Sequence, residues 1–244
     1  MEAELLAYVL VGFAAQLVDG ALGMAYGVLS TSFLLSTGLP PAAASASVHT
    51  AEVFTTGVSG LSHLYHDNIN RRLFLTLVVS GVAGGVLGAY VLTELPAEII
   101  KPFIAGYLAV MGLIILVKAF VTYPKEPPKR GVSPLAVVGG FLDAIGGGGW
   151  GPVVVSTLLA RGSDPRYTIG SVVAAEFFVT LSISVAFLLT IGIAHYQVVL
   201  GLVLGGILAA PFAGYLSKRL PARWLMVMAA IVIVTTSALT ILRP

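Results

Sequence analysis

Cysteine is absent from the 244 residues of this chain, which excludes disulfide bonds and thiolate metal sites within it. Charged residues are scarce too: they make up 10% of the chain, against about 25% in a soluble domain. Hydrophobic residues reach 57%, and no stretch between the apolar segments is long enough for a separate soluble domain. The composition therefore predicts an all-α polytopic membrane protein.

Several recognisable chemical motifs are also missing. The sequence contains no His-Glu-x-x-His, no phosphate-binding P-loop and no serine in a nucleophile elbow. We therefore expect no enzyme activity, no catalytic residue, no bound metal and no cofactor. The net charge of +2 gives no reason to expect a nucleic-acid partner. Without an ATP-binding element, any driving force would come from an ion gradient or the substrate gradient.

Eight apolar segments follow one another along the chain. A helix needs about 20 apolar residues to cross the hydrocarbon core, and six of the segments fit one crossing each. The first and the fifth hold an Asp and a glycine-rich stretch near the middle, so we expect each to be two half-helices. The segments are approximately 5–37, 41–65, 73–93, 97–120, 133–160, 167–191, 196–216 and 222–242.

The glycine-rich stretches are Asp19 to Gly27 and Asp143 to Gly151, and the second contains four consecutive glycines. Each glycine costs about 1 kcal/mol relative to alanine inside a helix. In a bilayer the freed backbone groups must be satisfied by protein or water. We therefore predict unwound backbone at 20–27 and at 144–151. Each break has a carboxylate at membrane depth, which usually marks function.

These stretches belong to an internal repeat with an offset of 124 residues. The acidic residues Asp19 and Glu52 recur as Asp143 and Glu176. Other residues that recur at this offset are Gly23, Gly27, Ser32, Leu34, Leu35, Gly38, Pro41, Ser47, Val48, Ala51, Phe54 and Thr56. We expect a first repeat over 1–123, a cytoplasmic Pro/Lys linker over 124–132 and a second repeat over 133–244. Together they would form one membrane domain.

The positive residues predict the topology, because Lys and Arg favour the cytoplasmic side. If each broken segment is a re-entrant hairpin, each half crosses the membrane three times and the two halves have opposite orientations. Eleven of the thirteen Lys and Arg then lie inside, and only Lys101 and Arg243 lie outside. The sequence thus predicts two inverted-topology repeats, each a broken re-entrant hairpin plus three transmembrane helices. Both termini would be outside.

Each half opens with Asp-x-x-x-Gly-x-x-x-Gly, continues through a turn with a proline, and then has Ser followed five residues later by Glu. In these motifs the chain resembles the sulfite exporter TauE/SafE family, over about residues 8–242. The run Gly-Gly-Gly-Gly-Trp-Gly-Pro at 146–152 is the most specific part. The resemblance implies a small permease for sulfite, organosulfonates and related anions.

The first half departs from the glycine-rich version of this motif. Ala25, Tyr26 and Val28 stand at the positions equivalent to Gly149, Trp150 and Pro152. The two half-sites are therefore expected to differ.

Discontinuous helices in inverted repeats aim half-helix N-termini at anions near the midplane. Such a terminus offers unpaired N–H groups and roughly half a positive charge. No Lys or Arg lies deep in the broken segments, so backbone donors would neutralise the anion. Alternatively, the glycines only allow close helix packing. The predicted substrate-binding residues are Gly20, Gly23, Met24, Tyr26, Gly27, Ser47, His49, Gly146, Gly147, Gly148, Gly149, Trp150 and Ser171.

The four acids Asp19, Glu52, Asp143 and Glu176 are not assigned as direct ligands, because a bare carboxylate would repel an anion. They would either couple transport to a proton or cation, or hold the unwound backbone by accepting its N–H groups; capping is favoured for the two Asp. His49 lies one turn before Glu52. It is either a proton carrier or anion partner, or a hydrogen-bonded core histidine.

Together these features predict a secondary transporter that moves a small sulfur-containing anion across the cytoplasmic membrane by alternating access. An anion channel lined by backbone N–H groups is the alternative. The expected partners are the anion, the lipid bilayer, a coupling proton or cation, and a second copy in a homodimer.

Overall fold

The computed structural model describes residues 2–121, 131–161, 163–192, 195–219 and 222–242, and all the regular structure in these ranges is helical. The predicted linker at 124–132 lies mostly outside them. The predicted all-helical class is confirmed. The helices are α1 (Glu2–Leu22), α2 (Tyr26–Ser36), α3 (Pro41–Tyr65), α4 (Arg71–Glu94), α5 (Ala97–Lys118), α6 (Val132–Gly146), the π-helix η1 (Trp150–Val155), α7 (Ser156–Ala160), α8 (Pro165–Thr190), α9 (Tyr196–Arg219) and α10 (Ala222–Leu242).

Prolines and polar caps set where the long helices begin. Pro41 and Pro165 occupy the first turns of α3 and α8, where a missing N–H costs no hydrogen bond. Asp164 caps α8 by accepting from the backbone N–H of Arg166 at 2.9 Å. Asn70 caps α4 in the same way, through Leu73 N–H at 3.1 Å. These local signals explain why the helices closely follow the apolar segments of the sequence.

Both predicted helix breaks are present, but they are shorter than expected. They span 23–25 and 147–149, at positions again separated by 124 residues. Gly20 continues α1 and Gly146 ends α6, so neither belongs to the unwound backbone. The unwound residues include Ala25 with φ 101° and Gly147 with φ 63°. Two or three residues with unusual dihedral angles are enough to reverse the chain, which is why the neighbouring glycines stay helical.

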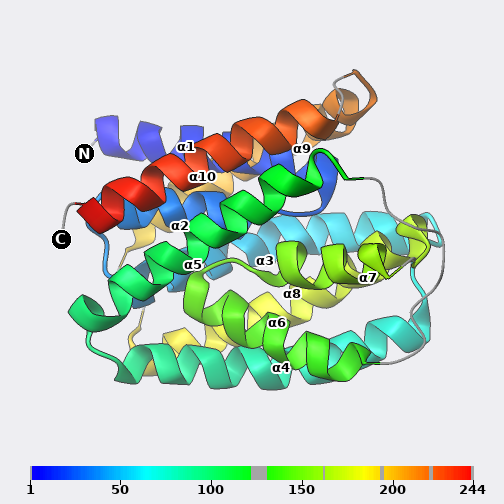
Figure 1. Ribbon diagram of the computed structural model, residues 1–244, viewed down its shortest axis with the longest axis horizontal. Coiled ribbons are helices and arrows are strands. Elements are labelled where there is room, and N and C mark those ends of the chain that lie inside the picture. Colours follow the sequence, from blue (N-terminus) through cyan, green and yellow to red (C-terminus); the bar gives the residue numbers. More distant parts are fainter. Residues whose placement is uncertain (1, 122–130, 162, 193–194, 220–221, 243–244) are drawn as a thin grey trace.

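The chain reverses direction at each break (Figure 1). In this view α1 runs from left to right and α2 returns to the left, so both ends of the first broken segment lie on the left. The second broken segment, from α6 through α7, begins and ends on the right. The three long helices after the first break run right, left and right, and those after the second run left, right and left.

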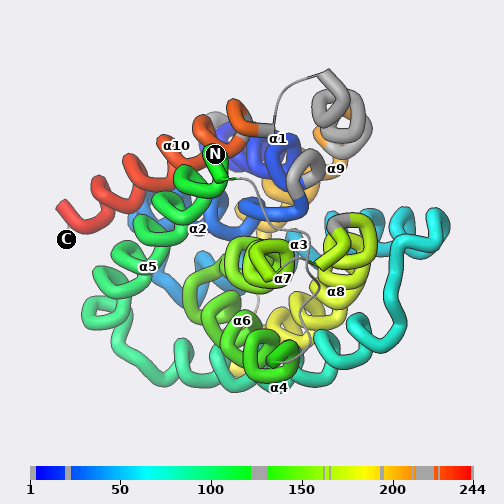
Figure 2. Tube along the Cα trace, turned by 45° about the vertical axis from the view of Figure 1, so that its right-hand side comes forward, coloured from blue at the N-terminus to red at the C-terminus, as the bar shows by residue number. Residues whose placement is uncertain are grey.

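Helices from the two halves of the chain are packed against one another. In Figure 2, α1, α9 and α10 lie along the top and α4 and α6 along the bottom. Glycines permit the closest contacts: a Cβ on Gly88 of α4 would lie 2.6 Å from the carbonyl oxygen of Phe141 in α6. A Cβ on Gly12 of α1 would lie 2.5 Å from the carbonyl oxygen of Leu202 in α9. Small residues at helix crossings are typical of membrane bundles.

Among the described residues, three helical stretches are long and apolar enough to cross a membrane. They are Arg71–Glu94, Ala97–Lys118 and Arg166–Thr190. Shorter apolar stretches occur in the broken segments and in the described parts of α9 and α10. α3 is long enough but buries polar residues, including Ser45, His49 and Glu52, which lower its hydropathy. These features support a multi-pass membrane protein.

Candidate functional site

The two breaks lie directly against each other at the centre of the bundle. A Cβ on Gly27 would lie 2.7 Å from the Cα of Gly148, and a Cβ on Gly151 would lie 2.8 Å from the Cα of Met24. These two contacts are equivalent under the 124-residue offset. The hydroxyl of Thr31 in α2 adds a hydrogen bond to the carbonyl oxygen of Gly147 at 2.5 Å. Glycine is needed here because the two backbones touch.

An aspartate caps the helix that follows each break. Asp143 accepts from the backbone N–H of Trp150 at 2.9 Å, and Asp19 accepts from that of Tyr26 at 3.4 Å. Both aromatic side chains are buried and hydrogen bonded to a neighbouring helix: Trp150 Nε1 donates to Val172 O, and Tyr26 Oη donates to Leu202 O. The tighter cap is in the second half, in line with the expected difference between the half-sites.

The second break has extra support from α5 that sequence reasoning did not predict. The hydroxyl of Tyr107 donates to the carbonyl oxygen of Gly148, in the unwound stretch, at 3.1 Å. Lys118 Nζ donates to Pro152 O at 2.8 Å, so a basic side chain does reach this break. No local signal in the sequence predicts these contacts, because Tyr107 and Lys118 lie on α5, in the other half of the chain.

A small cavity remains where the breaks meet, and all four predicted acids line it: Asp19, Glu52, Asp143 and Glu176. Its volume is about 10 Å³, at the lower limit for one water molecule. The other lining residues are Ala25, Tyr26, Gly27, Val28, Gly148, Gly149, Gly151 and Pro152. In this conformation the site is closed around its carboxyl groups.

Among these four acids, Glu52 has a buried carboxyl oxygen without a hydrogen-bond partner in the described part of the chain. Its carboxyl group accepts a hydrogen bond from the backbone N–H of Gly27. Its second oxygen, Oε2, is buried and has no hydrogen-bond partner among the described residues. Such a group is costly unless it is neutral or gains a partner. The cavity therefore contains an oxygen that can take a proton or a donor.

His49 is fully buried and joins α3 to α6. Its Nδ1 lies 2.8 Å from the carbonyl oxygen of Ser45, which can only accept, so Nδ1 carries a proton. Its Nε2 lies 3.2 Å from Asp143 Oδ2. That second contact requires one further proton, on either Nε2 or the carboxyl group. The His49–Asp143 pair is thus a shared-proton contact beside the second break, and the equivalent residue in the other half is Val173.

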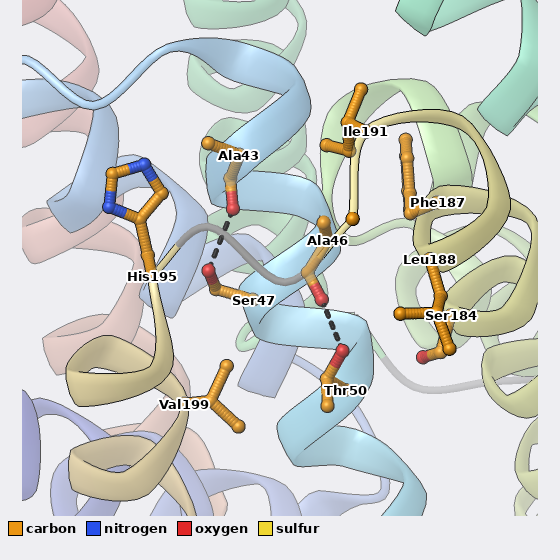
Figure 3. A pocket seen from close by; sticks show the side chains of 11 residues that line it. Ala43, Ala46, Ser47, Thr50, Ser184, Phe187, Leu188, Ile191, His195 and Val199 are labelled. Atoms are coloured by element: carbon orange, nitrogen blue, oxygen red, sulfur yellow. Dashed lines mark hydrogen bonds between the residues drawn. The ribbon is translucent and has the colours of Figure 1, made fainter.

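The two predicted serines lie away from the breaks. Ser47 lines a separate pocket with Thr50 and Phe187, and its hydroxyl donates to Ala43 O at 2.8 Å (Figure 3). Ser171 accepts from the backbone N–H of Asn70 at 2.9 Å, near the start of α4. The spacing of five residues to the glutamates places both serines on other sides of α3 and α8. Neither contributes to the cavity.

Apolar helices broken at glycines around buried carboxyl groups are typical of membrane transporters. The chain belongs to the sulfite exporter TauE/SafE family, whose model matches residues 8–240. It is also similar to the "Probable membrane transporter protein YtnM" of Bacillus subtilis (strain 168). The two are 40% identical over 249 residues, covering 98% of this chain and 83% of that protein. No solved structure matches the chain significantly.

Proposed function

We propose that this membrane protein is a secondary transporter for a small sulfur-containing anion, sulfite or an organosulfonate, across the cytoplasmic membrane. Membership of the TauE/SafE family supports transport rather than catalysis. The main support for a carrier mechanism is the direct contact between Gly27 and Gly148. A carrier needs a closed state in which no continuous pore exists, and two touching backbones provide that closure.

The anion would bind between the breaks after they separate. Tyr26, Gly27 and Trp150 would supply backbone N–H groups from the first turns of the two helices. The walls of this binding site would be formed by Gly23, Met24 and the glycines at 147–149. His49 would lie beside the second break, in contact with Asp143. The alternative, an anion channel, would need a continuous pathway through this point when open, and the cavity of about 10 Å³ does not provide one in this conformation.

Exchange across a membrane distinguishes these mechanisms. We expect purified protein in liposomes to show saturable counterflow: unlabelled anion trapped inside should accelerate entry of the labelled anion. Sulfite, sulfate, sulfoacetate, taurine and thiosulfate should be compared, with protein-free liposomes as the control. Flux that rises linearly with concentration and shows no counterflow would indicate a channel. Absence of flux for every anion would overturn the proposed substrate class.

We further propose that the halves 1–123 and 133–244 are inverted-topology repeats in one membrane domain, with six crossings, two re-entrant hairpins and both termini outside. The opposite helix directions after the two breaks support this arrangement (Figure 1). The charge bias supports it too, since eleven of thirteen Lys and Arg fall on one side. Movement of one repeat against the other would open the contact between the two breaks alternately to each side of the membrane.

This topology predicts where reporter domains will appear. Fusions after residues 128 and 221, both outside the described residues, should report a cytoplasmic location. A fusion after Leu95, between α4 and α5, should report the opposite side. Alkaline phosphatase and green fluorescent protein fusions in a bacterial host measure this. Opposite locations for the 128 and 221 fusions would contradict the inverted arrangement.

A further inference from the structure

We propose that the anion and the carboxyl groups compete for the same backbone N–H donors, so that each anion is bound together with protons. This inference rests on the proposed function and adds the coupling ion to it. The ligand is a proton, and its site is the cavity lined by Asp19, Glu52, Asp143 and Glu176. Transport would then be proton–anion symport.

The donors that an anion would need are already occupied. Trp150 N–H donates to Asp143, Gly27 N–H donates to Glu52, and Tyr26 N–H donates to Asp19. These are N–H groups at the starts of α2 and η1, where a helix offers unpaired donors. An oxyanion entering between the breaks must therefore displace carboxylate oxygens from the backbone. Two negatively charged groups cannot share one buried donor cheaply.

A second observation points to the proton as the ligand. Glu52 Oε2 is buried at the cavity and has no hydrogen-bond partner in the described part of the chain. Protonation would turn this oxygen into a hydrogen-bond donor. Although four acids line the cavity, the described residues contain no group of three or more His, Asp or Glu side chains placed to hold a metal ion together. The ionisable groups that face the cavity or its lining are Asp19 of α1, Tyr26 of α2, His49 and Glu52 of α3, Tyr107 and Lys118 of α5, Asp143 of α6 and Glu176 of α8.

Each proton taken up removes one carboxylate charge from the site and frees one backbone donor. A proton from the aqueous phase adds to a carboxylate oxygen, which becomes a neutral acid and a weak acceptor. The backbone N–H that it held is then free to donate to an oxygen of the anion. Asp143 already has a proton in its contact with His49, and Glu52 has the buried oxygen without a partner, so we assign the added proton to Glu52. Release of the anion returns the N–H to the carboxylate and expels the proton.

Proton uptake on binding tests this directly. Purified protein in detergent, weakly buffered at several pH values from neutral to alkaline and containing an indicator dye, would be mixed with sulfate or thiosulfate. Neither anion takes up a proton in that range, so any alkaline shift comes from the protein. We expect an alkaline shift that saturates with the anion and roughly one proton taken up per anion bound, by linkage. Binding measured separately by calorimetry should weaken as the pH rises.

The variant Glu52→Gln keeps an oxygen for the Gly27 N–H but cannot titrate. It should lose most of the proton uptake, and its anion binding should become nearly independent of pH. Glu98→Gln, the same change at an exposed position on α5, should behave like the wild type. Thermal unfolding of both variants controls for folding, and the wild-type measurement stands on its own if Glu52→Gln does not fold.

The outcomes separate this inference from the proposed function. Anion binding or counterflow without proton uptake, and with the same affinity at acidic and alkaline pH, would overturn proton coupling and leave the transporter intact. Absence of both binding and counterflow for every anion would overturn the proposed function and this inference with it. Full proton uptake by Glu52→Gln would overturn the assignment to Glu52.

Discussion

Replacing Gly148 with alanine is expected to reduce transport to the background level. The added Cβ would overlap Val28 N and the backbone of Gly27, and neither can move aside as a flexible side chain could. Gly148 also has φ 157°, which residues with a side chain rarely adopt. Because the two breaks could no longer close on each other, the carrier would lose its closed state. Counterflow in liposomes measures the effect.

Two further variants make the Gly148→Ala result interpretable. Gly27→Ala adds a methyl group on the other side of the same contact and should have the same consequence. Gly106→Ala, within α5, is the matched control because nothing lies within 4 Å of its added Cβ. It should transport normally and gain up to about 1 kcal/mol of helix stability. Normal counterflow by Gly148→Ala would show that contact between the breaks is not needed for transport.

Replacing Asp143 with alanine is the second change with a large expected effect. It removes the acceptor of Trp150 N–H and the partner of His49 Nε2, leaving two buried polar groups unsatisfied. Each such group costs about 1–3 kcal/mol. We expect a clear fall in the melting temperature of the purified protein and loss of counterflow. The η1 helix would lose the cap that fixes its first turn.

Asp19→Ala is the matched comparison, since Asp19 occupies the equivalent position in the first half. Its hydrogen bond to Tyr26 N–H is longer, at 3.4 Å, and the described contacts give it no histidine partner. The fall in melting temperature should therefore be smaller than for Asp143→Ala. Equal destabilisation by the two variants would contradict the assigned role of the His49–Asp143 contact. Asp143→Asn, which keeps an oxygen for Trp150 N–H, should recover part of the lost stability.

The difference between the half-sites follows from residues that differ at equivalent positions. Pro152 occupies the position equivalent to Val28, and in its half of the chain Tyr107 of α5 donates to the carbonyl oxygen of Gly148 while Lys118 donates to Pro152 O. The second break is therefore held by α5 as well as by its own aspartate. We infer that the first break is the more easily displaced of the two.

The sequence by itself determined the helical membrane class, the approximate limits of the helices and the existence of two breaks 124 residues apart. Hydropathy, glycine and proline act on the chain locally, so their effects can be predicted without knowing what packs against what. The exact length of each break was not predictable. Gly20 and Gly146 remain helical because residues 23–25 and 147–149 already reverse the chain, which no local rule can report.

Only the tertiary structure decided which groups meet. The contacts of Gly27 with Gly148, of His49 with Asp143 and of Tyr107 with Gly148 join residues far apart in the chain. Ser47 and Ser171 share the sequence spacing of the acids, yet they lie elsewhere because a step of five residues turns the side chain away on a helix. The position of a residue along the chain fixes its direction on its own helix. Which neighbour it faces depends on how the two halves pack together.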